Sequence, residues 1–156
     1  DDRWLYDQED SLGPIKEYNL KKQRPEISIA GNDITIVASG YTSLLAREAA
    51  TVLNEKNIKS EVIDTRILNP FCVDTIVNSV KKTKHLLVLD PGWISCGFSA
   101  EIVAKTVERI PIDCLKKPPV RIALPDAPAP TSRVLEKAYY TKKKDVILAA
   151  EGILNL

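Results

Sequence analysis

The sequence predicts an α/β protein in which helices cover both faces of a mainly parallel sheet. Short apolar runs rich in β-branched residues alternate with amphipathic segments of about ten residues, a pattern typical of parallel strands joined by helical crossovers. The chain has 156 residues, of which 28% are charged, and a formal net charge of +1. This length suits one domain with a sizeable core, so we expect a three-layer α/β/α sandwich.

The first half of the pattern predicts three strands and two helices. Ile27 and Ile29 alternate with polar neighbours, whereas Ile34–Ala38 is a β-branched run typical of a buried strand. Thr42 or Ser43 is expected to cap the first helix, whose apolar residues recur at helical spacing. The expected elements are strands near 26–30, 34–38 and 60–64, and helices near 42–56 and 74–80.

The second half predicts two more strands and three more helices. The apolar run that follows His85 ends in Asp90 and has the length of a third buried parallel strand. A proline-rich loop, "LPDAPAPTS", follows the last strand. The expected elements are strands at 85–90 and 120–124, and helices near 99–109, 133–138 and 143–154.

The start of the chain differs in character from the rest. Residues 1–25 contain few regularly spaced apolar positions, and we interpret them as an extended connector, with the globular domain at 26–156. The sequence contains no methionine, which leads us to expect a piece of a longer protein. The connector would then join this domain to a preceding domain of the parent.

The loop after the 85–90 strand raises the question of a phosphate site. Asp90 ends the strand, and Gly92 and Gly97 lie in a loop that opens a helix, an order that α/β proteins use to bind phosphate. However, bulky Trp93 lies between the two glycines, and the loop matches neither the dinucleotide nor the P-loop motif. Acids that end strands commonly cap the following turn, which is the role we favour for Asp90 and for Asp64.

The other chemistry-bearing residues form no complete catalytic set. His85, the sole histidine, lies at the start of a predicted strand, whereas the sites of parallel sheets lie at the carboxyl ends, so we predict a structural role. Arg66 is expected either to pair with Asp64 or to bind an anion. We therefore assign no catalytic and no cofactor-binding residue.

The cysteines and the composition exclude further classes. Cys72, Cys96 and Cys114 lack the spacing of metal ligands, so we predict no metal site and expect buried, reduced thiols. The chain has no basic excess and no apolar run of about 18 residues, so neither a nucleic-acid nor a membrane partner is expected.

Several segments, taken together, resemble the C-terminal domain of transketolase-like enzymes. They are, in order, "RWLYDQED", "DITIVASGYTSLLAREAATVL", "EVIDTRILNP", "SVKKTKHLLVLDPGW", "GFSAEIVAKTVE" and "LPDAPAPTS". Within that group the chain resembles, from Arg3 to about Leu154, the beta subunit of the thiamine-diphosphate-dependent 2-oxoacid dehydrogenase (decarboxylating) component. Pyruvate, acetoin and branched-chain enzymes belong to this subgroup. Two segments depart from the family pattern: residues 97–102 read GFSAEI where G-x-G-A-E-I is common, and residues 21–25 read KKQRP in place of a Gly-Lys-Ala segment.

The resemblance implies a fold and a division of labour. The implied sheet is mixed and five-stranded, in the order 1-3-2-4-5, with an antiparallel first strand. The implied parent is an oxidoreductase that decarboxylates a 2-oxoacid with thiamine diphosphate and magnesium and passes the acyl unit to lipoamide. In relatives the cofactors lie between other domains, so this chain alone is expected to bind no cofactor and to be inactive.

The resemblance also implies partners. These are an alpha subunit or the missing N-terminal, pyrimidine-binding domain, a second beta subunit and a dihydrolipoyl acyltransferase core. A cytoplasmic location of bacterial type is expected, with the mitochondrial matrix as the alternative.

An assembly surface is predicted where the strands end. Trp93 and Phe98 are large apolar residues in a loop, and Pro128 and Pro130 hold a second loop extended, which lowers the entropy lost on binding. Both loops follow parallel strands and should emerge at one edge of the sheet. We therefore predict these four residues as subunit-interface residues and the Gly92–Gly97 loop as a turn and contact surface.

Two alternatives remain open on the sequence. A free-standing flavodoxin-like nucleotide-binding or signalling module would bind its ligand near Gly40, Arg66 and Asp90. A stand-alone transketolase relative would share the domain but belong to a different enzyme.

Overall fold

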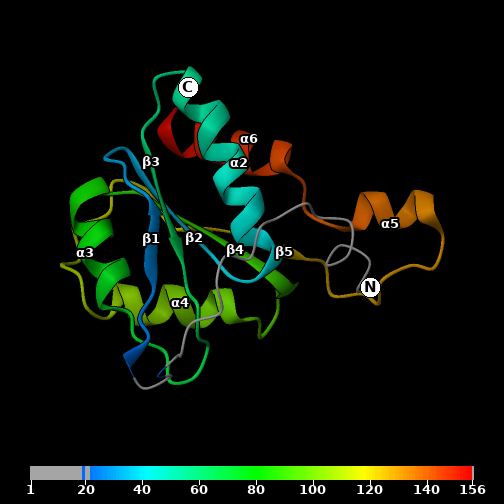
Figure 1. Cartoon of the computed structure of the whole chain (residues 1–156), viewed down its shortest axis with the longest axis horizontal. Helices are drawn as coiled ribbons and strands as arrows, with labels where there is room; N and C mark the ends of the chain where they lie inside the picture. The colour runs from blue at the N-terminus through cyan, green and yellow to red at the C-terminus, as the bar shows by residue number, and fades with distance from the viewer. Residues whose placement is uncertain (1–18, 20–21, 156) are drawn as a thin grey trace.

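Five strands form one mixed sheet in the order β1-β3-β2-β4-β5 (Figure 1). The computed structural model of the chain describes Asn19 and residues 22–155. β1 runs antiparallel to β3, and the other neighbouring strands pair in parallel, so the predicted order and the antiparallel first strand are confirmed. The strands are β1 (Glu26–Ile29), β2 (Ile34–Ala38), β3 (Ser60–Asp64), β4 (Leu86–Trp93) and β5 (Val120–Leu124).

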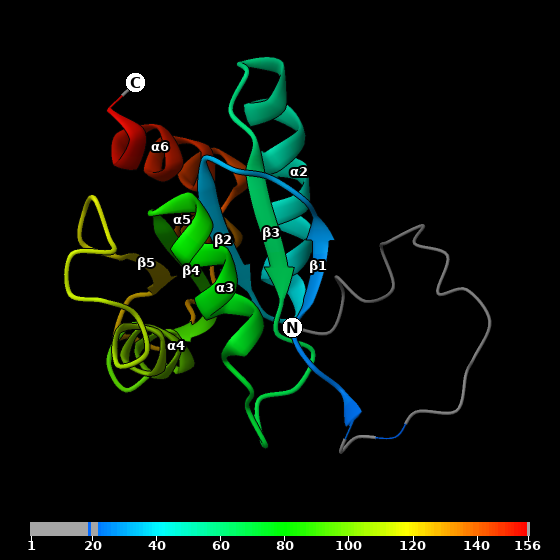
Figure 2. The same ribbon diagram turned by 90° about the vertical axis from the view of Figure 1, so that its left-hand side faces the viewer.

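Helices cover both faces of this sheet (Figure 2). One face packs against α2 and α6 and the other against α3 and α4, each with its own cluster of buried apolar side chains, which confirms the three-layer sandwich. The helix α5 stands apart from both layers (Figure 1). The helices are α2 (Tyr41–Glu55), α3 (Asp74–Thr83), α4 (Phe98–Val107), α5 (Arg133–Tyr139) and α6 (Lys143–Leu154).

The central strand β2 illustrates why a continuous apolar run predicts a strand that is covered on both faces. All five of its residues are buried, because successive side chains alternate between two covered faces. Ile36 packs with the α2 and α6 cluster, and Val37 packs with the α3 and α4 cluster. The polar exception is Thr35, whose hydroxyl lies 2.6 Å from Ser79 Oγ and 2.7 Å from Thr83 Oγ1.

Most observed bounds lie within three residues of the prediction, and the differences at α2 and β4 have local causes. The helix α2 begins at Tyr41 with Gly40 as its N-cap and without a side-chain cap, because Thr42 Oγ1 bonds instead to the N–H and carbonyl of Ser39. The strand β4 continues to Trp93, where it pairs with Leu124 after an irregular register. Among the residues that the structure describes, none of the helices has the length and hydrophobicity that a bilayer crossing requires.

Candidate subunit interface

Asp90, near the end of β4, organises the loop that opens α4. Its side chain is buried at 4% exposure. Asp90 Oδ1 accepts the N–H of Gly92 at 2.9 Å, and Oδ2 accepts the N–H of Ser99 at 2.6 Å. The N–H of Ser99 lies in the first turn of α4, where a bound phosphate would need free backbone N–H donors. The carboxylate of Asp90 already accepts this N–H. Asp90 therefore caps the following turn, as predicted.

Gly97 is required by the same packing. A Cβ atom at Gly97 would lie 2.0 Å from the carbonyl oxygen of Trp93 and 2.9 Å from Asp90 Oδ2, so no side chain fits there. A Cβ at Gly92 would also lie 3.1 Å from Asp90 Oδ1. The glycines of this loop thus make room for the chain's own carboxylate.

The residues at this edge do not fit the pyrophosphate and magnesium of thiamine diphosphate. The carboxylate of Asp90 already occupies the amides of the loop. Within the described part of the chain, no group of three or more His, Cys, Asp or Glu residues is placed to hold a metal ion. We therefore derive no cofactor chemistry from these residues.

The β4–α4 loop and the β5–α5 loop lie side by side, as predicted from their place at the ends of parallel strands. Ser95 Oγ donates to Asp126 Oδ2 at 2.5 Å, and the Ser95 N–H donates to Oδ1 of the same carboxylate at 3.1 Å. Trp93 Nε1 donates to Tyr139 Oη at 3.1 Å, and that hydroxyl donates to the carbonyl of Ala127 at 2.6 Å. These bonds join both loops and α5 into one surface.

This surface carries several apolar side chains that are exposed. None of the seven residues of α5 is buried, and Val134 and Leu135 are 78% and 59% exposed. Trp93 is 54% exposed. Clusters of exposed apolar groups rimmed by polar residues are typical of interaction sites. We call it the carboxyl-edge surface; its residues are Trp93, Pro128, Pro130, Val134, Leu135 and Tyr139.

The predicted interface residues occupy different environments. Trp93 and Pro128 are exposed and Pro130 is half-buried. Phe98 is half-buried, and its ring packs edge-on against Phe71 with the ring centroids 5.0 Å apart. Much of the Phe98 ring therefore supports the packing of α4 within the domain, and Trp93 is the more exposed of the two aromatics.

Val134 and Leu135 were missed by the sequence reasoning. With Ala138 and Tyr139 they form an apolar stripe along α5 at helical spacing. Such a stripe normally packs on the core of its own domain, and nothing in the local sequence indicated that this one faces outward. The sequence pattern therefore indicates an apolar stripe on α5, but it does not indicate whether the stripe faces the core or the solvent.

The other residues considered on the sequence have internal partners. Asp64 Oδ1 accepts the N–H of Arg66 at 3.0 Å, so Asp64 also caps its turn as predicted. The Arg66 guanidinium pairs with Glu26, which the antiparallel pairing of β1 with β3 brings opposite Asp64. His85 precedes β4 at the amino edge of the sheet, and its Nδ1 lies 2.8 Å from the carbonyl oxygen of Asp33.

The expectation of buried cysteines is correct for one of the three. Cys114 is buried, Cys72 is half-buried and Cys96 is exposed, and all three are free thiols. Cys96 is exposed because it lies in the loop before α4, where its φ is 56°.

Comparisons with known proteins identify relatives. The family model described as "Transketolase, C-terminal domain" matches residues 24–146. The mitochondrial pyruvate dehydrogenase E1 component subunit beta of Bos taurus is 36% identical over 147 residues, which are 94% of this chain and 39% of the bovine protein. The corresponding subunit of Rickettsia bellii is 38% identical over 123 residues, which are 79% of this chain and 38% of that protein. The chain thus spans well under half the length of these relatives.

Solved structures agree on the fold. A split gene transketolase, described as an inactive beta4 tetramer, matches with a TM-score of 0.72 and 26% identity over 85% of this chain and 42% of that chain. A 2-oxoglutarate:ferredoxin oxidoreductase from Magnetococcus marinus matches with a TM-score of 0.59 and 15% identity over 84% of this chain and 20% of that one, a likeness of fold alone. Because the family model covers most of the described sheet and helices, the chain belongs to the transketolase C-terminal domain family.

Proposed function

We propose that this chain is the C-terminal domain of the beta subunit of a 2-oxoacid dehydrogenase (decarboxylating) component, and that the domain serves subunit association. The observation that carries the proposal is the 36% identity to a pyruvate dehydrogenase E1 beta subunit along 94% of the chain. The parent would decarboxylate a 2-oxoacid with thiamine diphosphate and magnesium and transfer the acyl unit to lipoamide. Residues 1–25 would connect this domain, at 26–156, to the pyrimidine-binding domain of the parent.

The carboxyl-edge surface supports the association role. It combines an exposed Trp93 with the exposed stripe of α5, and the bond from Trp93 to Tyr139 holds the two in a fixed arrangement. A preformed apolar surface loses little entropy when a partner covers it. Its partner would be an alpha subunit, the N-terminal domain of the parent or a second beta subunit. Phe98 would contribute only its exposed edge.

The proposal extends to a further partner and to a location. A dihydrolipoyl acyltransferase core would be the docking partner of the assembled enzyme. The bovine relative is a mitochondrial protein and the Rickettsia relative is bacterial, so the cytoplasm and the mitochondrial matrix are both consistent with the proposal. The solved transketolase with a TM-score of 0.72 favours a second candidate, in which the parent is a transketolase.

The test is the activity of the full-length parent. The complete beta subunit, co-expressed with its alpha partner, should reduce an artificial electron acceptor when given thiamine diphosphate, magnesium and one of pyruvate, acetoin or a branched-chain 2-oxoacid. Ketol transfer between sugar phosphates without any 2-oxoacid activity would instead establish the transketolase parent. The 156-residue chain is the matched control and should be inactive with every substrate.

Cofactor binding by the chain itself gives an independent test. A thermal melt of the 156-residue chain should not change with millimolar thiamine diphosphate and magnesium. A rise of several degrees would require a ligand well above its dissociation constant, and it would contradict the placement of the cofactor outside this domain.

A further inference from the structure

A pocket lies at the amino edge of the sheet, at the opposite end of the strands from the carboxyl-edge surface. Its volume is about 390 Å³, within the range of small-molecule sites. Segments far apart in the sequence contribute to its walls: the turn before β2, the end of α2, the turn between α3 and β4, the segment before β5 and the end of α6. Lys82, Lys84 and Lys116 line it together with Asp33, Ile58 and Leu154.

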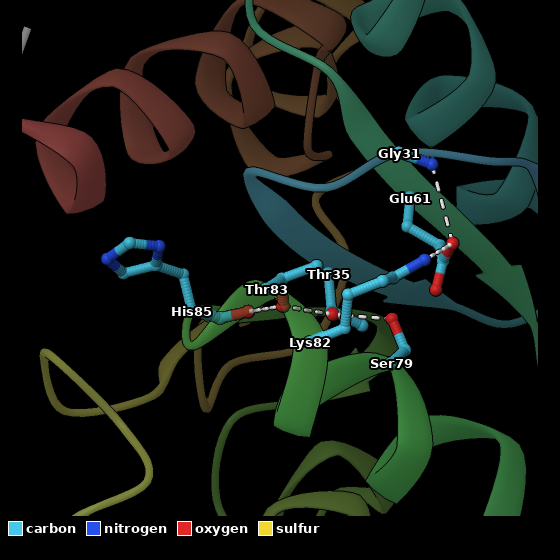
Figure 3. A network of polar contacts seen from close by, with 7 residues as sticks. All are labelled: Gly31, Thr35, Glu61, Ser79, Lys82, Thr83 and His85. Carbon is cyan, nitrogen blue, oxygen red and sulfur yellow. Dashed lines mark hydrogen bonds and ion pairs between the residues drawn. The ribbon is translucent and has the colours of Figure 1, made fainter.

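Of the three lysines, Lys82 is already neutralised within the domain. Its Nζ lies 2.5 Å from Oε2 of the buried Glu61, and Figure 3 shows the side chain extended toward that carboxylate and away from His85. Lys84 Nζ lies 3.8 Å from Sγ of Cys114. Neither Lys84 nor Lys116 forms an ion pair with a carboxylate of the described residues.

Lysines near helix ends often serve only to offset the partial negative charge of the terminal carbonyls. Lys117 has that role here. Lys117 Nζ donates to the carbonyl of Gly152 at 3.3 Å at the end of α6. Among the described residues, the Lys84 ammonium bonds to the Cys114 thiol alone, and no side-chain hydrogen bond of Lys116 is present.

The backbone holds the two lysines near each other. The Lys116 N–H donates to the carbonyl of Lys84 at 3.1 Å, and Lys84 occupies the left-handed C-cap of α3 with a φ of 65°. The facing acid, Asp33, is engaged because its Oδ2 accepts the N–H of Lys59 at 2.6 Å. His85 Nδ1 is engaged within the domain by the carbonyl oxygen of Asp33, so we base the case for positive charge in the pocket on the two lysines.

We propose that this amino-edge pocket binds a small ligand through an oxyanion group, a phosphate or a carboxylate, held between Lys84 and Lys116. The two ammonium groups outnumber the one facing carboxylate, so the local charge is positive and favours an anionic group. Ile58 and Leu154 supply an apolar wall for the rest of the ligand. The site is at the other edge of the sheet from the carboxyl-edge surface and does not depend on the assembly role.

The experiment is a nuclear magnetic resonance titration of the isotope-labelled 156-residue chain. Inorganic phosphate and malonate are the two probes, each at constant ionic strength with chloride as the reference. Saturable shifts confined to the amides of Asn32, Lys84 and Lys116 are expected, and the probe that saturates first identifies the oxyanion as phosphate or carboxylate. Shifts that chloride reproduces, that do not saturate, or that spread over the surface lysines would overturn the proposal.

Charge-removing variants give the matched control. Lys84→Gln with Lys116→Gln should weaken binding at least tenfold, while Lys144→Gln on the exposed start of α6 should leave it unchanged. Circular dichroism verifies folding. If the double variant does not fold, Lys116→Gln alone serves, because Lys116 is exposed and its hydrogen bond to Lys84 comes from the backbone. Equal binding by Lys116→Gln and the wild type would refute the site.

Discussion

Asp90 and Glu61 are buried carboxylates at opposite edges of the same sheet, and they are stabilised in different ways. Asp90 accepts two backbone N–H groups of its own loop. Glu61, 2% exposed on β3, pairs with the Lys82 ammonium of α3 and accepts the N–H of Gly31 at 3.4 Å. Asp90 therefore determines the shape of a loop, whereas Glu61 holds a helix against a strand.

The pKa of Glu61 reflects this contrast. Burial alone would raise the pKa of the Glu61 carboxyl. Hydrogen bonds from Lys82, Ser79 and the Gly31 N–H, together with the charge of Lys82, outweigh burial and hold the pKa below its ordinary value. Glu61 therefore contributes stability that is present above the pKa of the unfolded chain and is lost as the pH falls through the lower folded pKa.

The largest effect is expected from Asp90→Ala, which should lower the free energy of unfolding by about 3 kcal/mol. The substitution leaves buried amides of the loop, including that of Ser99, without an acceptor. Urea denaturation measures the change. Asp113→Ala, at an exposed aspartate in the segment before β5, is the control and should cost less than about 0.5 kcal/mol. Equal losses for both variants would contradict the role of Asp90.

Trp93→Ala tests the surface built above Asp90. It should weaken subunit association of the full-length parent by about 2 kcal/mol, or roughly thirtyfold, because exposed aromatic anchors often dominate an interface. Sedimentation velocity measures the association. Leu148→Ala, at a 55% exposed leucine of α6, is the control and should leave assembly unchanged. A folded Trp93→Ala variant that assembles with wild-type affinity would remove Trp93 from the interface.

Lys82→Gln removes the ion-pair partner of Glu61 and should lower the free energy of unfolding by about 1–2 kcal/mol at neutral pH. The cost is below that of a fully buried pair because the Lys82 side chain is 44% exposed. A protonated Glu61 no longer needs the ammonium, so the stability difference between variant and wild type should narrow as the pH falls from 7 to 3. Urea midpoints across this range measure it, and a difference independent of pH would show that Lys82 acts through packing alone.

The smallest effect is expected from His85→Gln, which should change the turnover of the full-length parent little. The imidazole makes one hydrogen bond, to the carbonyl of Asp33, at the edge of the sheet away from the carboxyl ends of the strands. Turnover of the full-length parent should stay within a few-fold of wild type. A steady-state assay that finds a loss of about 10²–10⁴ would instead identify a general acid or base.

The positions of the central strands and the roles of two turn residues could be predicted from the local sequence. The strands at Ile34–Ala38, Ser60–Asp64 and Val120–Leu124 were predicted with their observed bounds. This succeeded because a strand covered on both faces must be apolar over its whole length, and such a run is visible without any partner. The capping role of Asp90 was also predictable, since its acceptors and donors lie within ten residues of each other.

The contacts between side chains of different elements could not be predicted from the sequence. Glu61 on β3 pairs with Lys82 on α3, and Arg66 pairs with Glu26 of the antiparallel strand β1. The apolar stripe of α5 is exposed instead of packing on the core. Lys84 and Lys116 likewise meet in one pocket although a strand and a helix separate them in the chain. The periodicity of a segment shows which side of a helix or strand is apolar or charged. Which other element packs against that side depends on the order of the strands and the packing of the layers, and these are set by contacts between residues far apart in the sequence.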